Sequence, residues 1–315
     1  MLSRVAESVF WMSRYIHRAE HTARLVDINL QLLLDLPGAL ADQWEPLVTI
    51  TAEQDYFASR YGDATQRNVL EFLVFDNQYP SSIANSLRAA RENARTVRDF
   101  ISAEIWEQVN EFYHFVVSER APVHAKEDPH GFFARVRNHG HLFSGLVDGT
   151  LEHGQGYHFI KLAEYLERAD QTSRVLDVKY FLLLPGAEYV GTTLDDVQWA
   201  AVLKSASALE SYRKRHHRIR PRDIAEYLLL DPDFPRSAAK CVADARGALH
   251  AITGNPLDRP RTEPEMVLGR LAADLKFGTI DEVFEVGLHE YIDRLQARLN
   301  ESGAAVSRAF FQFRA

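Results

Sequence analysis

YIHRAEHTARLVD (15–27) and YLERADQTSRVLD (165–177) are two copies of one short pattern, separated by 150 positions. Six of the thirteen positions are identical, and five more are conservative exchanges. Around both copies, apolar residues recur at alternating steps of three and four, the spacing of one face of an α-helix. The two rows are Val9, Met12, Ile16, Ala19, Ala23, Val26, Leu30 and Leu33, and Phe159, Leu162, Leu166, Ala169, Ser173, Leu176, Tyr180 and Leu183. They predict two helices of about eight turns each, ending at the Leu-Pro-Gly sequences 36–38 and 184–186.

The repetition extends beyond these helices. FDNQYPSSIANSLRAAR (75–91) resembles LDPDFPRSAAKCVADAR (230–246) at an offset of 155, which Trp44 and Trp199 share. We therefore expect one duplicated helical unit, residues 1–150 and 151–315, packed as a single compact body with a shared core and a pseudo-twofold axis. Period-two alternation is rare, so the expected fold class is all-α, a bundle of about a dozen helices without a sheet.

The composition bounds the function. The chain has 315 residues, of which 46% are hydrophobic and 25% charged, as in ordinary globular proteins. Its net charge of −8 argues against general nucleic-acid binding. A single cysteine, Cys241, cannot form an internal disulfide, which favours a cytoplasmic location, and its helical pattern predicts a core position. No stretch has the pattern of a signal peptide or the length of a membrane span.

The repeated helix carries paired charges. Glu20 and Arg24 are four residues apart, and so are Asp170 and Arg174, which is the favourable order for a side-chain pair on a helix. Local pairing on a solvated face is a sufficient explanation for these residues, with about 0.3–0.5 kcal/mol for each pair.

Arg18 and Arg168 need a different explanation. Arg168 has Glu164 four residues before it, whereas Arg18 has a like charge, Arg14, at that position. Arg18 shares an aromatic sector of its helix with Trp11, so it requires a counter-charge from another helix, a ligand, or the face of the Trp11 ring. The residues expected at or near the seam between the halves are Tyr15 and Tyr165, Arg18 and Arg168, and Thr22 and Thr172.

MLSRVAESVFWMSRYIHRAEHTARLVD (1–27) and GYHFIKLAEYLERADQTSRVLD (156–177) resemble the bacterial alpha-E domain family, an all-helical domain named for its Glu-Arg motif. The resemblance covers nearly the whole chain, including RENARTVRDFISAEIWEQVN (91–110) and LLLDPDFPRSAAKC (228–241). The motif stands here as Glu167-Arg168, and the first copy has His17-Arg18 instead. Because neighbouring helix positions point roughly 100° apart, Glu167 and Arg168 are not a preformed ion pair, and each needs a partner elsewhere.

The resemblance implies a pathway but no activity. Family members look like products of gene clusters that also encode circularly permuted ATP-grasp amide ligases and transglutaminase-like proteases, which implies peptide synthesis or modification. One hypothesis is a non-catalytic accessory protein that binds such a ligase, such a protease or a peptide. The other is an enzyme whose Arg18 and Arg168 bind a carboxylate or phosphate between the halves, with Glu167 as acid or base. The accessory role is favoured, because Glu167 falls on the polar helix face, where no perturbed pKa is expected.

Two basic features are further candidates for partner binding. Arg88, Arg91, Arg95 and Arg98 recur at helical spacing and are expected on one helix face, forming inter-helix salt bridges or binding an anion or an acidic partner. YRKRHHRIRPR (212–222) is interpreted as a solvated connection, with binding of nucleic acid or an acidic protein surface as the alternative. The histidines lack clear metal-ligand spacing and no nucleotide motif is present, so no metal or cofactor is expected.

Overall fold

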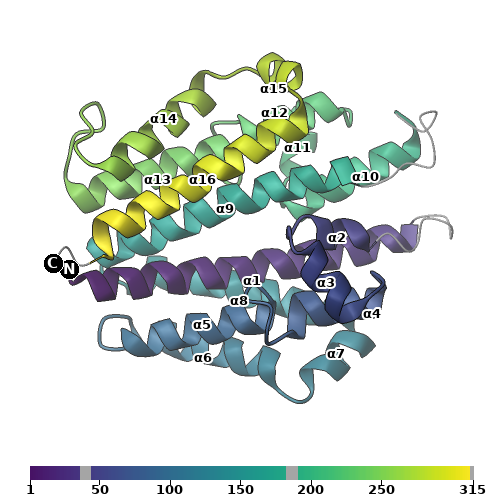
Figure 1. Cartoon of the computed structure of the whole chain (residues 1–315), viewed down its shortest axis with the longest axis horizontal. Coiled ribbons are helices and arrows are strands. Elements are labelled where there is room, and N and C mark those ends of the chain that lie inside the picture. Colours follow the sequence, from purple (N-terminus) through teal and green to yellow (C-terminus); the bar gives the residue numbers. More distant parts are fainter. Residues whose placement is uncertain (36–43, 182–190, 313–315) are drawn as a thin grey trace.

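The computed structural model describes residues 1–35, 44–181 and 191–312 (Figure 1). These residues form sixteen α-helices and one π-helical turn, with no strand among them. The predicted all-α fold is therefore confirmed. The number of helices exceeds the expected dozen because several contain only five to nine residues. Among the described helices, none combines the length and the apolar character that crossing a membrane requires.

The two repeated segments form the two long central helices, α1 (Ser3–Asp35) and α9 (Gln155–Phe181). Both expected Leu-Pro-Gly ends lie outside the described residues. Each central helix packs against two long helices of its own half, and a third long helix covers those two. Around α1 these are α5 (Ile83–Thr96), α8 (Pro129–Thr150) and the covering α6 (Ala103–Val117). Around α9 they are α13 (Ala238–Thr253), α16 (Leu288–Phe310) and the covering α14 (Glu263–Phe277).

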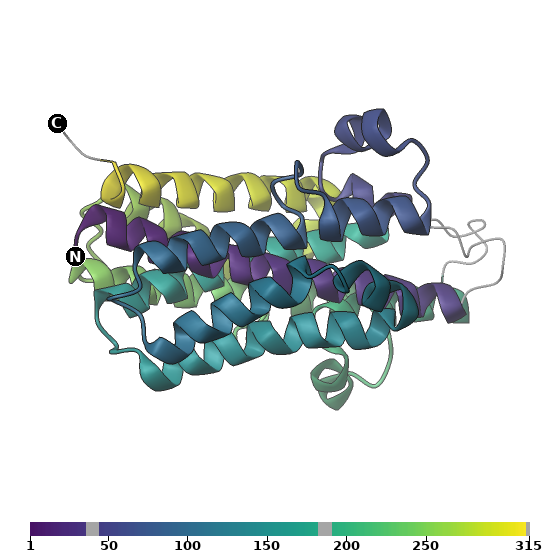
Figure 2. The same cartoon turned by 90° about the horizontal axis from the view of Figure 1, so that it is seen from below.

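Most of the remaining elements lie toward the end of the bundle away from the N-terminus (Figures 1 and 2). In the first half they are α2 (Glu45–Thr49), α3 (Gln54–Tyr61), α4 (Gln66–Leu70), the π-helical turn Glu71–Phe75 and α7 (Ala121–Glu127). In the second half they are α10 (Thr193–Ser205), α11 (Leu209–Arg215), α12 (Pro221–Leu229) and α15 (Ile280–Val286).

The central helices lie side by side and run parallel, with the first half on one side and the second half on the other (Figure 1). A residue further along α1 contacts a residue further along α9. The Met1 amino group donates to Gln155 Oε1 at 2.9 Å, and Ser13 Oγ donates to the carbonyl of Ile160 at 2.9 Å. These pairs are 154 and 147 positions apart, close to the repeat offset, so equivalent residues of the two copies face the same seam.

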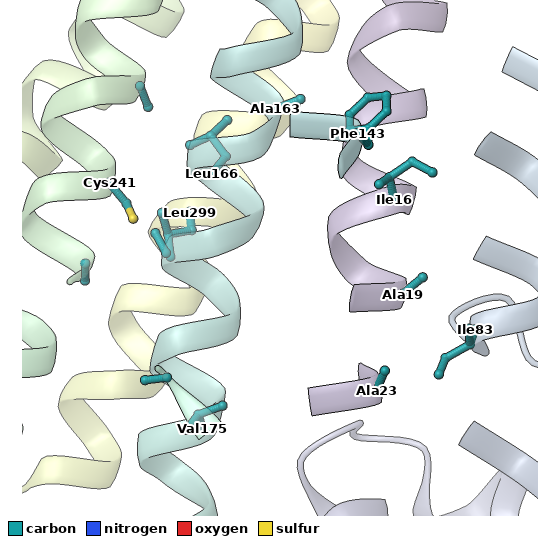
Figure 3. Close-up of a cluster of buried hydrophobic side chains, with 14 of the residues drawn as sticks. Ile16, Ala19, Ala23, Ile83, Phe143, Ala163, Leu166, Val175, Cys241 and Leu299 are labelled. Carbon is teal, nitrogen blue, oxygen red and sulfur yellow. The ribbon is translucent and has the colours of Figure 1, made fainter. Parts of the chain in front are cut away.

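The apolar rows form the core on the outer sides of the two central helices. Figure 3 shows Ile16, Ala19 and Ala23 of α1 on the side of Ile83, whereas Leu166 of α9 lies on the side of Cys241 of α13. Cys241 is 0% exposed, which confirms its predicted core position. One continuous cluster of buried apolar side chains includes residues of both halves. Burial of a side chain of leucine size contributes roughly 1.5–3 kcal/mol, so this cluster is the main source of stability.

Two equivalent loops start α5 and α13. Ser82 caps α5, and its hydroxyl donates to the carbonyl of Asp76 at 2.6 Å. Ser237 caps α13 and donates to the carbonyl of Asp231 in the same way. Both Asp side chains also accept backbone N–H groups two and three residues later. These hydrogen bonds explain why Asp and Ser recur at an offset of 155. The common origin of the two halves stays a prediction.

Candidate functional site

Several charged side chains of the repeated segments lie between α1 and α9. Each central helix turns its apolar face toward its own half and its polar face toward the other central helix. We call the resulting cluster the seam network. Its members are Arg14, His17, Arg18, Glu20, His21 and Arg24 on α1, Lys161, Glu164, Glu167 and Arg168 on α9, His141 on α8, and Arg236 in the loop before α13.

Glu167, the acid of the motif, has both carboxylate oxygens occupied. Arg18 donates from Nε to Oε1 at 2.9 Å and from Nη2 to Oε2 at 3.0 Å. Arg14 Nε lies 2.5 Å from Oε2, and Gln171 Nε2 donates to Oε1 at 3.1 Å. Burial alone would raise the pKa of Glu167, but the charges of Arg18 and Arg14 lower this pKa far below its usual range. The carboxylate is therefore ionised at every physiological pH.

The expectation that Glu167 lies on an exposed polar face with an ordinary pKa is wrong. Its side chain is 0% exposed. The helical angle of each residue predicts one buried face for α9, whereas α1 covers the polar face of α9 as well. Of the interpretations left open for Arg18, the counter-charge from another helix is confirmed. The guanidinium of Arg18 also lies 5.7 Å from the ring of Tyr15, while Arg14 is the residue near Trp11.

Glu164 organises the second part of the seam network. Arg168, the base of the motif, pairs with Glu164 one turn earlier on α9, and Lys161 Nζ lies 2.7 Å from Glu164 Oε2. Burial would raise the pKa of Glu164, but His17 and Arg168 lower it to about 2. The prediction that Glu167 and Arg168 use different partners is therefore confirmed. The motif contributes one ion pair across the seam and one along its own helix.

Glu20 organises the third part and connects three elements. Arg24 Nη2 lies 2.5 Å from Glu20 Oε1, and Arg236 Nη2 donates to the same oxygen at 3.1 Å. His141 Nε2 is 3.5 Å from it. Arg236 also donates to His21 Nε2 at 3.0 Å, so that nitrogen is an acceptor and the His21 ring is neutral. Burial lowers the pKa of His21, although Glu20 opposes the shift.

The two helical pairs of the repeat form as predicted, but their solvated setting is wrong. Arg24 and Arg174 contact Glu20 and Asp170 at 2.5 and 2.8 Å. Glu20 is 2% exposed and Asp170 6% exposed. Glu20 is covered by His141 of its own half and by Arg236 of the other half. Arg174 Nη1 also donates to the carbonyl of Ile50 at 2.9 Å. These pairs therefore tie separate elements together instead of covering a surface.

His17 occupies the position that Glu167 has in the second copy, so the first copy has a base where the second copy has an acid. Its Nδ1 lies 3.9 Å from Glu20, and its Nε2 lies 3.9 Å from Glu164. The contacts Arg14–Glu167 and His17–Glu164 are equivalent under the offset of 150, with acid and base exchanged between the helices. The other residues expected at the seam are also covered. Tyr15, Tyr165 and Thr22 are partly buried, and Thr172 is 1% exposed.

The seam network contains more cations than acids. Each of its three buried carboxylates contacts two cationic side chains, which makes six cations for three acids. Among the described residues, Lys161 is the only one of these six cations that forms an ion pair with a further acid, Asp148, at 3.3 Å. Burial also lowers the pKa of Arg236, which neighbouring Arg168 and Arg24 repel. Buried donors without a hydrogen-bond acceptor in the described structure include Arg24 Nε and His21 Nδ1.

Sequence reasoning missed Arg236, His141 and Lys161 as members of this cluster. Arg236 replaces a serine, Ser81, at the equivalent position of the first copy, and that asymmetry was the only available signal. Two cavities lie elsewhere, one of about 500 Å³ between α14, α15 and α16 and one of about 560 Å³ beside α10 and α11. Neither is lined by a residue of the seam network.

The four arginines expected on one helix face do not all lie on the same helix. α5 ends at Thr96, so Arg98 lies in the following turn, and the expectation of a single helix face is wrong for it. Arg91 donates to Asn110 at 2.8 Å, and Arg95 pairs with Glu92 at 2.7 Å within the helix. Their companions are also engaged, since Arg88 donates to Asn85 and Arg98 lies 5.2 Å from the ring of Trp106. Binding of an anion or partner by this row stays a prediction.

One group of side chains has the composition of a metal site. One ligand atom from each of Asp177, His289 and Asp293 lies within 4.8 Å of the others. His289 Nδ1 is 2.8 Å from Asp177 Oδ1, which accounts for the contact as an inter-helix hydrogen bond. The equivalent Asp27 pairs with Arg137 and His130 instead. Sequence spacing gave no indication of this group, because its members come from α9 and α16.

The comparison with family models gives one match, over residues 1–311, to the Alpha-E family, described as a predicted α-helical domain with a conserved Glu-Arg motif. No curated protein and no solved structure matches the chain. The Glu-Arg dipeptide occurs at 167–168 and also at 119–120, where both side chains are exposed in a turn. Only the first of these lies in the helix that the chain repeats, at the centre of the seam network. This chain belongs to the Alpha-E family of α-helical domains.

Proposed function

We propose that this protein is a non-catalytic helical partner of an ATP-grasp peptide (amide) ligase system, and that it acts in the cytoplasm in peptide synthesis or modification. The family resemblance supplies the pathway, since family members look like products of gene clusters that encode such ligases and transglutaminase-like proteases. The single buried Cys241, free of any disulfide, suits a reducing compartment.

One observation carries the non-catalytic part of the proposal. Glu167 is 0% exposed, and two guanidinium groups occupy its carboxylate. A general acid or base needs a pKa near the working pH and a path to its substrate. The pKa of Glu167 lies far below that range, because Arg18 and Arg14 outweigh the effect of burial. In this proposal the motif fixes the relative position of the two halves, and the outer helices remain available to partners.

The test is a pull-down of the tagged protein from its native host, with partners identified by mass spectrometry. Recovery of an ATP-grasp ligase in equimolar amount supports the proposal, and recovery of no protein above an untagged control rejects it. Arg18→Ala and Arg168→Ala variants, shown to be folded by circular dichroism, would report whether binding requires an intact seam. Adding the purified protein to the ligase then measures whether it changes the rate of amide formation.

A second candidate is an enzyme of the same pathway that binds a carboxylate or phosphate group between the halves. The observation in its favour is the excess of cations in the seam network, since a buried unmatched positive charge is costly without an anion. Thermal unfolding in inorganic phosphate, compared with sodium chloride at equal ionic strength, tests this candidate. Stabilisation by phosphate that Arg236→Gln abolishes would support it, and equal melting temperatures in the two salts would reject it.

A further inference from the structure

A cavity of about 560 Å³ lies beside α11 and the loop that follows it, apart from the seam network. Arg213, His216, His217 and Arg218 contribute to its lining. Asp195 and Asp196, at the start of α10, line it as well. Asp195 is internally satisfied, because it pairs with Lys179 at 3.0 Å and accepts the N–H of Gly191 at 3.0 Å. Asp196 is exposed, so its carboxylate is available at the cavity.

Among the basic side chains that line this cavity, His216 has an acidic partner, because its Nδ1 lies 3.9 Å from Asp223 Oδ2. The other basic side chains of the lining, and two of their neighbours in sequence, have none in the described structure. Arg213, Lys214, His217, Arg218 and Arg220 are exposed, and in the described structure none of these side chains makes an ion pair or hydrogen bond. We call these five residues the α11 basic patch. Two nearby arginines do have acidic partners, because Arg215 pairs with Asp231 and Arg222 pairs with Asp281. In a chain with a net charge of −8, the patch is a local reversal of the surface potential.

The loop that carries the patch is held in place. Tyr212 is 0% exposed, and its hydroxyl donates to the carbonyl of Arg218 at 3.0 Å, which folds the loop back onto α11. The ring of His216 stacks on Tyr212 with centroids 4.5 Å apart. These contacts keep Arg213 and Arg218 at one cavity although they are five positions apart in sequence. Of the segment expected to be a solvated connection, only residues 216–220 connect two helices, because 212–215 end α11 and 221–222 begin α12. These contacts give the connection a defined shape.

We propose that the cavity and the α11 basic patch bind an acidic polypeptide segment, a run of Asp or Glu side chains presented by a partner protein. This inference rests on the proposed partner role and names its docking surface. A guanidinium group donates two parallel hydrogen bonds to one carboxylate, so Arg213 and Arg218 suit such side chains. The exposed Asp196 can accept N–H groups from the backbone of an extended peptide.

The same features favour a peptide over a single-stranded nucleic acid. Binding of single-stranded nucleic acid without sequence preference relies on exposed aromatic rings that stack on bases. Residues 213–220 include no Phe, Tyr or Trp, and Tyr212 is buried.

Fluorescence polarisation of a labelled glutamate octamer, titrated with the full-length protein at low salt, tests the inference. The Arg213→Gln/Arg218→Gln/Arg220→Gln variant should bind about tenfold more weakly, since three exposed charge contacts are lost. Arg259→Gln/Arg261→Gln/Arg270→Gln is the matched control, because it changes the net charge equally at exposed positions outside the patch. It should bind like the wild type. Both variants are checked for native circular dichroism.

Equal affinity of the patch variant and the control variant would overturn the inference. Tighter binding of an octamer of thymidylate than of the glutamate octamer would overturn the choice of an acidic peptide. In the host pull-down, a patch variant that still recovers the ligase would overturn this docking surface and leave the proposed function standing. Loss of the ligase with the patch variant alone is the result we expect.

Discussion

Replacing Glu167 by Gln removes one buried charge at nearly constant side-chain size, and the structure sets the expected cost. Arg14 and Arg18 share this carboxylate, and their side chains are only 11% and 21% exposed. A glutamine oxygen can accept from one guanidinium, but its NH₂ group would face the other. Removing one partner of a buried ion pair costs ~3–5 kcal/mol. Because water reaches the edges of both arginines, we expect the lower end, about 3 kcal/mol of unfolding free energy.

Urea denaturation followed by far-ultraviolet circular dichroism measures this free energy. Glu92→Gln is the matched control, because Glu92 pairs with Arg95 at the surface, where the two side chains are 48% and 65% exposed. That change should cost less than about 1 kcal/mol. A double-mutant cycle of Glu167→Gln with Arg18→Gln should give a coupling energy of about 2 kcal/mol. If Glu167→Gln cost no more than the control, the conclusion that the motif holds the two halves together would be refuted.

Three further predictions concern packing, acid and thiol chemistry. Gly140→Ala should destabilise by about 1–3 kcal/mol, because the new Cβ would lie 2.8 Å from Glu20 Cγ, whereas Gly145→Ala on the same helix, with nothing within 4 Å, should not destabilise the protein in the same urea titration. Despite burial, cationic neighbours hold the pKa of Glu164 at about 2, below the usual 4.5. The stabilisation by ionised Glu164 is therefore complete above pH 4.5 and is lost as the pH falls toward 2. Over this pH range the wild type should lose more unfolding free energy than Glu164→Gln. Parallel curves of unfolding free energy against pH for the two proteins would contradict this prediction. Burial raises the pKa of the Cys241 thiol to about 12, so a disulfide reagent should label it only on unfolding, and rapid labelling of the native protein would argue against a closed core.

The long helices could be predicted because their pattern is local. Apolar residues at every third or fourth position mark the face of the helix that becomes buried. This pattern does not depend on which element covers that face. The first row from Val9 to Val26 is buried as predicted. The repeat even indicated which positions would meet, since two copies that face each other bring equivalent residues to one seam. Arg18 was identified as a residue that needs a partner from elsewhere, and that partner is Glu167.

The remainder of the seam network depends on residues that are distant in sequence. Arg236 reaches Glu20 across 216 positions, and His141 approaches the same carboxylate from α8. No local pattern marks an arginine in a loop as buried. The predicted environment of Glu167 was wrong for a related reason. A helical wheel shows the angle of a side chain, but it does not show the second helix that covers that side chain.

The sequence by itself therefore determined the helical class, the two central helices, the apolar faces and the positions of the repeated charges. These follow from periodicity, which each segment carries alone. Only the tertiary structure decided which charges pair, how deeply they are buried and how far the pKa of each acid moves. Those properties depend on the local dielectric and on partners from other helices, and both exist only after the two halves have packed.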